Sequence, residues 1–394
     1  MKYDFERIID RSNTRSYKWD QSEKLFGRKD ILPLWVADMD FESPPAVKEV
    51  LLRRAQEGIY GYSVPSDSYK EAILSWYGRH HDWKIEKEWI TDSPGIVTSL
   101  SLAVELFTAP GDPVIIQSPV YYPFYDVIQM NDRKVAKNPL LLKGGRYEMD
   151  YAGLEELMKD GAKLLLLCSP HNPGGRVWER EELLRLGGLC LQYGVTVISD
   201  EIHCDLAMPG YKHIPFASLS AELSDITVTT LAATKTFNLP GLQTSYIVAS
   251  NPALRLKFER KLKALSLHMA SFFAQEAVEA AYNEGDEWLE QLVQHVAGNA
   301  EYAIAYLQEK LPAIRVMKPQ ATYLLRMDCT ALGLDAAGLK QLMYAEAGVA
   351  FNEGSVFGTE GQGHLRINLA CPRSLLTRAL ENFTRAASAH TAKI

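Results

Sequence analysis

The sequence predicts an α/β protein with a mainly parallel central sheet covered by helices, joined to a smaller α+β domain. Short, continuous apolar segments bounded by turn residues recur between residues 89 and 249. Such segments are typical of strands that are buried on both faces of a parallel sheet. Helical patterns separate them, as expected for successive strand–helix–strand units. After residue 250 the order changes to long helical patterns followed by short strands, which indicates the second domain.

The first 42 residues are irregular, polar and aromatic, and they end in an apolar cluster that contains Asp38 and Asp40. We expect this arm to pack on another part of the chain. A helix is then predicted with Ser43 as its N-cap and Pro44 in its first turn, ending before Gly58. A tyrosine-rich loop follows and leads to a second helix.

Six segments are expected to form the strands of the central sheet: 89–91, 113–116, 163–168, 195–199, 225–231 and 246–249. Helices are predicted between them at 96–107 and 179–193. Two longer helical patterns, up to about residue 283 and over 287–311, lead into the second domain. There we expect strands at 314–328, 349–351 and 364–369, and helices at 339–347 and 375–387.

The composition argues against several classes of protein. The net charge of −7 and the isoelectric point near 5.8 leave no basic surface for nucleic acid. The five cysteines are scattered and form no C-x-x-C pair, so neither a disulfide framework nor a zinc site is indicated, and no metal site is predicted. The charged N-terminus argues against a signal peptide, and no apolar run approaches the roughly 20 residues of a membrane span. We therefore expect a cytoplasmic protein.

Lys235 is the first candidate for chemistry. It lies among small and hydroxyl residues directly after the predicted strand 225–231. The carboxyl end of a buried strand is where α/β proteins place their ligands. On its own, a loop lysine is most often simply solvated. A functional role for Lys235 therefore depends on whether other strand ends supply partners for it.

Three other loops could contribute to a ligand site. Gly95, Ile96 and Val97 open a helix directly after a strand, where free amides and the helix dipole bind phosphate, although an ordinary turn also explains them. The ring of Tyr121 could lie over a flat heteroaromatic ring or be an ordinary packed aromatic. Asn172 lies in a turn sequence, and its amide could also bind a polar ring substituent.

Three charged or titratable residues lie at or within predicted strands. Asp200 ends a buried strand, where a carboxylate is costly unless it pairs with a cation, such as that of a cofactor, or caps a helix. His203 is either a second contact to the ligand or a packed histidine. Arg366 lies in an apolar strand and requires either a bidentate anion, such as a substrate carboxylate, or a structural ion pair.

The combination is more specific than any of its members. A lysine, an aspartate, an asparagine, a stacking tyrosine, a helix-end anion site and a carboxylate-binding arginine would together hold a pyridine ring. That ring would carry a phosphate and an aldehyde, and the substrate would be an amino acid. These are the properties of pyridoxal 5′-phosphate (PLP), which binds a lysine as a Schiff base and pairs its ring nitrogen with an acidic residue.

Along nearly the whole chain, these motifs resemble those of the fold type I, aspartate-aminotransferase-like PLP enzymes. The matching positions are Tyr62, Gly95-Ile96-Val97, Tyr121, Asn172-Pro173-x-Gly175, Asp200-Glu201-x-His203, Thr234-Lys235 and Arg366-x-Asn368. Within that superfamily the chain is most similar to the MalY/PatB-type cystathionine β-lyases, also called C–S lyases. The segments that carry this similarity are 35–41, 200–203, 235–242 and 368–373.

The resemblance implies roles around the cofactor ring. Lys235 is the catalytic residue that forms the Schiff base, and Asp200 pairs with the pyridinium nitrogen. Asn172 and His203 approach the 3′-oxygen of the ring, and Tyr121 stacks on the ring face.

The resemblance also implies how the phosphate is bound. The residues that hold it are Gly95, Ile96, Val97 and Thr234. Many aminotransferases have a phosphate-binding arginine a couple of turns after the lysine, whereas this chain has Leu242, Gln243 and Thr244 there. We therefore expect amides, hydroxyls and the helix dipole to meet the phosphate charge.

On the substrate side, the resemblance implies that Arg366 binds the substrate carboxylate, with help from Asn172 and the backbone near Ala37. It also implies a homodimer with shared active sites, in which Tyr62 reaches the neighbouring subunit's cofactor and substrate. The loop after Tyr62 looks short for the family, so Tyr60 is an alternative to Tyr62.

From the same resemblance we predict an N-terminal arm that contributes to the small domain at 1–45, a large PLP-binding α/β domain at 46–285 and a small α+β domain at 286–394. The expected reaction is β-elimination on L-cystathionine or related L-cysteine S-conjugates, giving a thiol, pyruvate and ammonia. An aminotransferase on the same site is the first alternative. A regulatory protein that binds a transcription factor is the alternative of another class.

Overall fold

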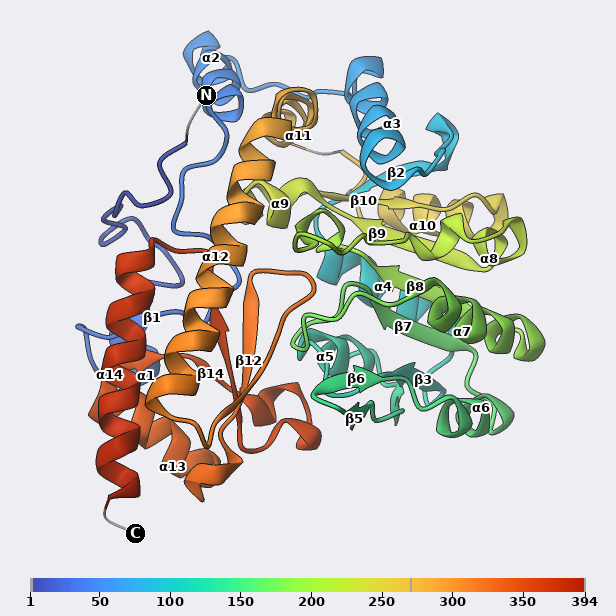
Figure 1. The fold of residues 1–394 in the computed structure, drawn as a ribbon. Coiled ribbons are helices and arrows are strands. Elements are labelled where there is room, and N and C mark those ends of the chain that lie inside the picture. Colours follow the sequence, from blue (N-terminus) through green and yellow to red (C-terminus); the bar gives the residue numbers. More distant parts are fainter. Residues whose placement is uncertain (1–2, 270, 393–394) are drawn as a thin grey trace.

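The computed structural model describes residues 3–269 and 271–392, and its central feature is a seven-stranded sheet (Figure 1). The strand order is β2 (Ile90–Ser93), β10 (Ser245–Val248), β9 (Thr227–Leu231), β8 (Thr196–Asp200), β7 (Leu164–Cys168), β3 (Pro113–Ile116) and β4 (Lys134–Lys137). Neighbouring strands from β9 to β4 pair in parallel, whereas β10 runs antiparallel to both β9 and β2. The prediction of a mainly parallel sheet is confirmed.

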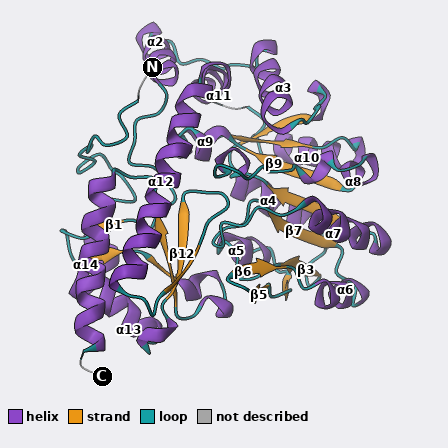
Figure 2. Ribbon diagram, viewed as in Figure 1, coloured by secondary structure: helices purple, strands orange, loops and turns teal. Residues whose placement is uncertain are grey.

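Helices cover both faces of this sheet, as Figure 2 also shows. One apolar cluster joins strand residues such as Leu166 and Val228 to α4 (Ile96–Phe107), α5 (Pro123–Gln129) and α10 (Pro252–Ala264). Another joins Leu165 and Val197 to α6 (Tyr151–Lys159), α7 (Arg180–Tyr193) and α8 (Ala221–Asp225). Because successive strand residues point to opposite faces, two covered faces bury every residue of inner strands such as β7 and β9.

A second sheet has four antiparallel strands in the order β11 (Arg315–Met317), β12 (Leu324–Asp328), β15 (His364–Asn368) and β14 (Asn352–Glu353). It accompanies the helices α12 (Asp286–Lys310), α13 (Ala336–Gln341) and α14 (Arg373–Thr391), and a π-helical turn at Leu342–Ala347. The N-terminal strand β1 (Leu32–Pro33) pairs in parallel with β13 (Val349–Ala350). The arm therefore lies against the C-terminal part of the chain.

The remaining elements connect these layers. They are α1 (Ser22–Phe26), α2 (Pro45–Glu57), α3 (Asp67–His81), α9 (Ala233–Thr236), α11 (Phe272–Glu284) and the hairpin of β5 (Leu141–Lys143) with β6 (Arg146–Glu148). Within the described residues, no helix is long and apolar enough to cross a membrane.

Several predicted elements differ from the structure. Pro44, not Ser43, is the N-cap of α2, because the Ser43 hydroxyl donates to the carbonyl of Asn238 instead. The long pattern before residue 283 forms two helices, α10 and α11. The predicted strand 314–328 is interrupted between β11 and β12, where Gln320 N–H donates to Gly175 O. Strands β4, β5 and β6 were not predicted, since they are short and carry exposed polar side chains.

A buried ionic network holds the arm in place. Lys18 is 0% exposed, and its Nζ lies 2.6 Å from Asp40 Oδ2 and 3.4 Å from Asp38 Oδ1. Arg11 pairs with the same two carboxylates at 2.8 and 2.9 Å. Burial opposes the charge on Lys18, but Asp40 and Asp38 raise its pKa, so the ammonium stays charged. The network fixes the backbone that directly follows Ala37, and Ala37 borders the candidate active site.

Candidate active site

A cavity of about 340 Å³ lies at the carboxyl ends of β7, β8 and β9, beside the end of the N-terminal arm. All of the predicted site residues except Arg366 and Tyr62 line it: Ala37, Gly95, Ile96, Val97, Tyr121, Asn172, Asp200, His203, Thr234 and Lys235. A larger hollow of about 560 Å³ lies between α2 and α11, and it contains none of these residues. The smaller cavity is therefore the candidate active site.

Lys235 lies in the short helix α9 directly after β9, at the edge where the parallel strands end. Its Nζ donates to the carbonyl of Ala37 at 2.6 Å. Burial lowers the pKa of Lys235 to about 8, against the opposing effect of Asp38. The ammonium form loses more from desolvation than the neutral amine does. A neutral amine, able to act as a nucleophile or a base, is thus accessible near neutral pH.

The first turn of α4 borders the same cavity as Thr234. β2 ends at Ser93, and α4 begins at Ile96 with no side chain capping its first turn. A Cβ atom placed on Gly95 would meet nothing within 4 Å, so the backbone here faces open space. Gln243 and Thr244 also line the cavity. Free helix amides together with these hydroxyl and amide groups can bind a phosphate without an arginine.

Asp200 ends β8 as a buried carboxyl with little compensation. Its Oδ1 accepts a hydrogen bond from Ile202 N–H at 3.2 Å, and no ion pair to it occurs among the described residues. Burial, with a smaller contribution from Glu201, raises the pKa of Asp200 to about 7. A cation placed in the cavity beside this carboxyl would restore its ionised form.

His203 is a neutral, incompletely bonded ring in the same wall of the cavity. Its Nδ1 is buried, and it has no hydrogen-bond partner among the described residues. Burial and then the charge of Lys235 lower the pKa of His203 to about 3. A buried polar nitrogen without a partner is costly, so His203 is suited to bind an atom of a ligand.

Arg366 does not line the cavity itself, but it hydrogen-bonds to Asn172, which does. Its Nη1 donates to Asn172 Oδ1 at 2.8 Å, and its Nη2 donates to Asn352 Oδ1 at 2.6 Å and Trp35 O at 2.9 Å. No carboxylate pairs with it among the described residues, and its Nε has no partner. Burial lowers the pKa of Arg366 to about 10. The arrangement disfavours the structural ion pair and favours an external anion.

Tyr62 does not reach the cavity of its own chain. Its side chain is 96% exposed in the loop between α2 and α3. Tyr60, by contrast, donates to Ala55 O at 3.0 Å and stacks on Phe272 at 6.2 Å. The contact of Tyr62 with a neighbouring subunit stays a prediction.

Some residues around the site were missed by the sequence analysis. Tyr323 donates to the same Ala37 carbonyl as Lys235, at 3.0 Å, and its ring lies edge-on to His203. Asn352 holds Arg366. Both lie far from the motifs in sequence, and Tyr323 lies in a segment that the sequence indicated as plain strand, so no local signal identifies either residue.

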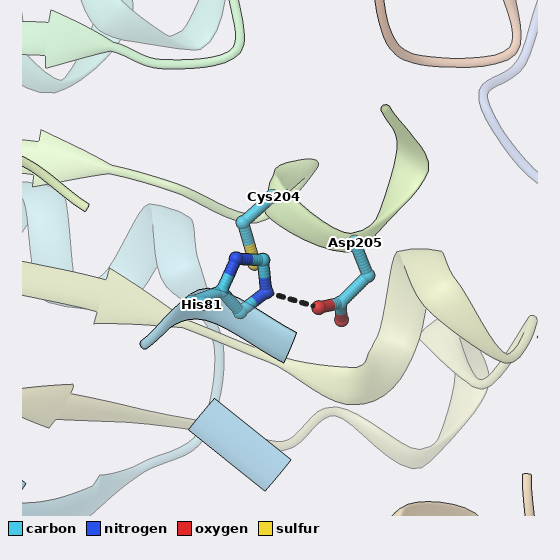
Figure 3. A group of neighbouring side chains, drawn as sticks. All are labelled: His81, Cys204 and Asp205. Atoms are coloured by element: carbon cyan, nitrogen blue, oxygen red, sulfur yellow. Dashed lines mark hydrogen bonds and ion pairs between the residues drawn. The ribbon is translucent and has the colours of Figure 1, made fainter. Parts of the chain in front are cut away.

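A separate group of side chains contacts α9 at Thr236, the residue after Lys235. Its members His81, Cys204 and Asp205 are shown in Figure 3. Asp205 accepts hydrogen bonds from His81 Nε2 at 2.7 Å, from Trp76 Nε1 at 3.0 Å and from the hydroxyl of Thr236 at 2.7 Å. Burial opposes the ionisation of Asp205. The hydrogen bond and the charge interaction with His81 outweigh burial, together with smaller contributions from Thr236 and Trp76, and lower the pKa of Asp205 to about 2. Since Thr236 follows Lys235, this fully bonded carboxylate anchors α9.

The donor set of the cavity fits PLP. A lysine amine is available for the aldehyde, a buried carboxyl lacks a cation, and a buried imidazole nitrogen lacks a partner. The uncapped first turn of α4 also borders the cavity and faces open space. Each of these groups matches one functional group of the cofactor.

Comparisons with known proteins agree with this geometry. Residues 29–383 match the family model described as aminotransferase class I and II. The chain is 46% identical to cystathionine beta-lyase PatB of Bacillus subtilis over 98% of this chain and 100% of that protein. It is 33% identical to protein MalY of Escherichia coli over 98% of each. The structure of cystalysin from Treponema denticola, which contains a pyridoxal 5′-phosphate cofactor, superposes with a TM-score of 0.96 at 38% identity, covering 99% of this chain and 100% of that one. The chain therefore belongs to the aminotransferase class I and II family, in the group that includes PatB and MalY.

Proposed function

We propose that this chain is a PLP-dependent carbon–sulfur lyase. It acts by β-elimination on L-cystathionine or related L-cysteine S-conjugates and gives a thiol, pyruvate and ammonia. The observation that carries the proposal is the cavity in which Lys235, Asp200 and His203 each lack the partner that PLP provides. The relative named cystathionine beta-lyase, at 46% identity over the full length, supports the reaction type.

Each side chain has a defined task in this reaction. When bound, PLP supplies an electron sink for the electron pair left at the substrate's α-carbon. Lys235 removes the α-proton at Nζ, which its pKa of about 8 permits. Arg366 orients the substrate through its α-carboxylate. Asp200 holds the proton on the cofactor's ring nitrogen. The bond between the β-carbon and sulfur then breaks, and the sulfur takes up a proton and leaves as a thiol. The three-carbon enamine that remains is hydrolysed by water, after its release, to pyruvate and ammonia.

An aminotransferase is the second candidate, favoured by the family model that the chain matches. Both reactions begin with removal of the same α-proton by Lys235. They differ in where the proton held by Lys235 would go next, and transamination would also require a 2-oxo acid to accept the amino group. The need for a 2-oxo acid therefore separates the two functions.

The test is to incubate purified holoenzyme with L-cystathionine and follow pyruvate with a coupled lactate dehydrogenase assay. We expect continuous pyruvate and thiol formation in equal amounts without any 2-oxo acid. A single turnover that resumes only when a 2-oxo acid is added would instead establish the aminotransferase. A panel of S-substituted cysteines in the same assay identifies the preferred leaving thiol.

The proposal includes a homodimer with shared active sites. It is supported by the exposure of the Tyr62 side chain and by the engagement of Tyr60 within its own chain. We place the protein in the cytoplasm, supported by five buried free cysteines. The division into an arm (1–45), a large domain (46–285) and a small domain (286–394) is part of the same proposal.

Mixing two inactive variants tests the shared site. Tyr62→Ala and Lys235→Ala are each expected to be inactive or strongly impaired as homodimers. In a hybrid dimer, one site combines the Lys235 of one subunit with Tyr62 of the other and is intact. Unfolding and refolding the two variants together should therefore restore lyase activity. If the mixture stays as inactive as its components, Tyr62 does not act across a subunit boundary.

A further inference from the structure

A second cavity, of about 380 Å³, lies between the β5–β6 hairpin and the four-stranded sheet. The hairpin contributes Leu142 and the turn residues Gly144 and Gly145, and the sheet contributes side chains of β11, β12 and β15. It shares no lining residue with the candidate active site. A ligand there would contact the hairpin and the sheet at once.

The side chain that makes this cavity unusual is Arg326, in the middle of β12. It is 2% exposed, and burial lowers its pKa. Its Nη2 donates to Glu360 O at 3.3 Å, and its guanidinium lies 5.4 Å from the ring centre of Tyr147. Its Nε is buried without a hydrogen-bond partner, and no carboxylate forms an ion pair with it among the described residues. Asp328 and Tyr147 support its charge only in part, so the guanidinium lacks the close ion pair that usually compensates a buried arginine.

The residue opposite Arg326 on the neighbouring strand is a second buried arginine, Arg366, which we assign to the substrate carboxylate. Arg326 lies directly opposite Arg366 in the β12–β15 register. Both are buried arginines with an unpartnered Nε and, among the described residues, no acidic partner. Arg366 contacts the active-site cavity through Asn172, whereas Arg326 lines the second cavity. These two opposite positions therefore place one buried arginine beside the active-site cavity and one in the second cavity.

The second cavity also offers a place for a positive charge. Asp328 lies two residues after Arg326, on the same face of β12 and about 7 Å along the strand. Its Oδ1 accepts from Thr330, which leaves its Oδ2 for another donor. Opposite Asp328 in the register, His364 donates from Nδ1 to Gln362 O at 2.9 Å, so its Nε2 is an acceptor. A carboxylate receptor therefore lies next to two acceptors for an ammonium group.

We propose that this cavity is a second binding site for a free α-amino acid, separate from the active site. Arg326 binds the carboxylate, and Asp328 with His364 binds the ammonium group. The side chain of the amino acid occupies the remaining space beside Leu142 and Met317. Arg315, on the exposed edge strand β11, adds positive charge at the rim.

The experiment uses amino acids that cannot form a neutral Schiff base with the cofactor. L-Proline, sarcosine and N-methyl-L-leucine carry both charges, but their secondary amine has no second N–H to lose, and any reaction with PLP would appear as a change in its absorbance. Each is titrated into the holoenzyme by calorimetry, while the cofactor's visible absorbance is followed in parallel. We expect saturable binding of at least one of them with no change in the absorbance.

Variants assign the binding to its site. Arg326→Gln should weaken binding by about 10- to 100-fold, because a charge-assisted bond to a buried carboxylate is lost. Arg326→Lys should weaken it less, since a lysine keeps the charge but not the planar pair of donors. Arg366→Gln, which alters the residue opposite Arg326, should weaken this binding clearly less than Arg326→Gln does, because Arg366 does not line the second cavity. Circular dichroism and the cofactor absorbance check that each variant is folded.

A further variant tests the class of ligand. Asp328→Asn should weaken the binding of L-proline while leaving that of propionate, a carboxylate without an amine, unchanged. Equal effects on both would show a simple anion site and overturn the amino-acid assignment. Absence of saturable binding for all three amino acids would overturn the proposal, as would binding that survives Arg326→Gln but is lost in Arg366→Gln.

Discussion

Lys235→Ala is expected to lower turnover of an L-cysteine S-conjugate by about 10⁴-fold or more, the upper range for removal of a general base. Two functions are lost at once, because the Nζ atom both binds the cofactor aldehyde and removes the α-proton. The fold should be unaffected, since among the described residues the only side-chain hydrogen bond lost is that to Ala37 O, which Tyr323 also contacts. Pyruvate formation and far-UV circular dichroism measure the two outcomes.

A matched control is Lys212→Ala, which removes an exposed lysine paired with Asp82 at 3.3 Å. It should leave activity unchanged, because exposed ion pairs contribute little. Borohydride reduction followed by peptide mass analysis should find the cofactor on the peptide of Lys235 in the wild type and on no lysine in the variant. Added methylamine, as a small substitute base, should restore part of the activity. Full activity of Lys235→Ala without added amine would refute the assigned role.

The parts of the fold that could be predicted from sequence are those with a strong local pattern. β7 is apolar throughout and β8 has an apolar centre, because both faces of the sheet are covered, and this makes the two strands recognisable. β4 was missed because it is an edge strand with lysines at both ends, Lys134 and Lys137. The break between β11 and β12 was missed because a tertiary contact with Gly175 causes it.

The same distinction applies to the site. Asp200, Lys235 and Gly95 were predictable because each follows a strand, and parallel strands bring their carboxyl ends to one edge. Tyr323 was not, since its place beside Ala37 depends on how the second sheet meets the arm. The buried pairing of Lys18 with Asp40 was missed because no local pattern connects two residues that are 22 positions apart in the arm.

Asp200→Asn is expected to lower turnover by about 10²-fold or more, because a preorganised charge that supports the electron sink is removed. Affinity for PLP should fall as well, since the ring nitrogen loses the carboxylate partner that lines the cavity. Turnover is measured as pyruvate formation at saturating PLP, and affinity by titrating the apo-protein with PLP. Unchanged turnover would contradict the role of Asp200.

Asp200→Asn should raise the stability of the apo-protein, although it lowers turnover and the affinity for PLP. The folded pKa of Asp200 is about 7 and the ordinary value is 3.8. Between these pH values the folded chain retains a proton that the unfolded chain has lost, so stability falls as pH rises from about 4 to about 7 and stays reduced above that. Asparagine does not titrate. The apo form of Asp200→Asn should therefore melt at a higher temperature than wild type at pH 8, with a smaller difference at pH 5.

Asp205→Asn is the matched comparison, because it alters another buried aspartate five residues away. Burial alone would raise the pKa of Asp205, but its contacts, chiefly with His81, lower the pKa to about 2. An ionised carboxylate that is held by its partners stabilises the fold at every pH above about 4 and loses this effect only as pH falls toward 2. Asp205→Asn should thus melt at a lower temperature than wild type at both pH 8 and pH 5. Opposite shifts in the two variants at pH 8 would show that Asp200 is kept at the expense of stability for the cofactor, whereas Asp205 is kept for the fold. A lowered melting temperature for both apo variants at pH 8 would refute this distinction.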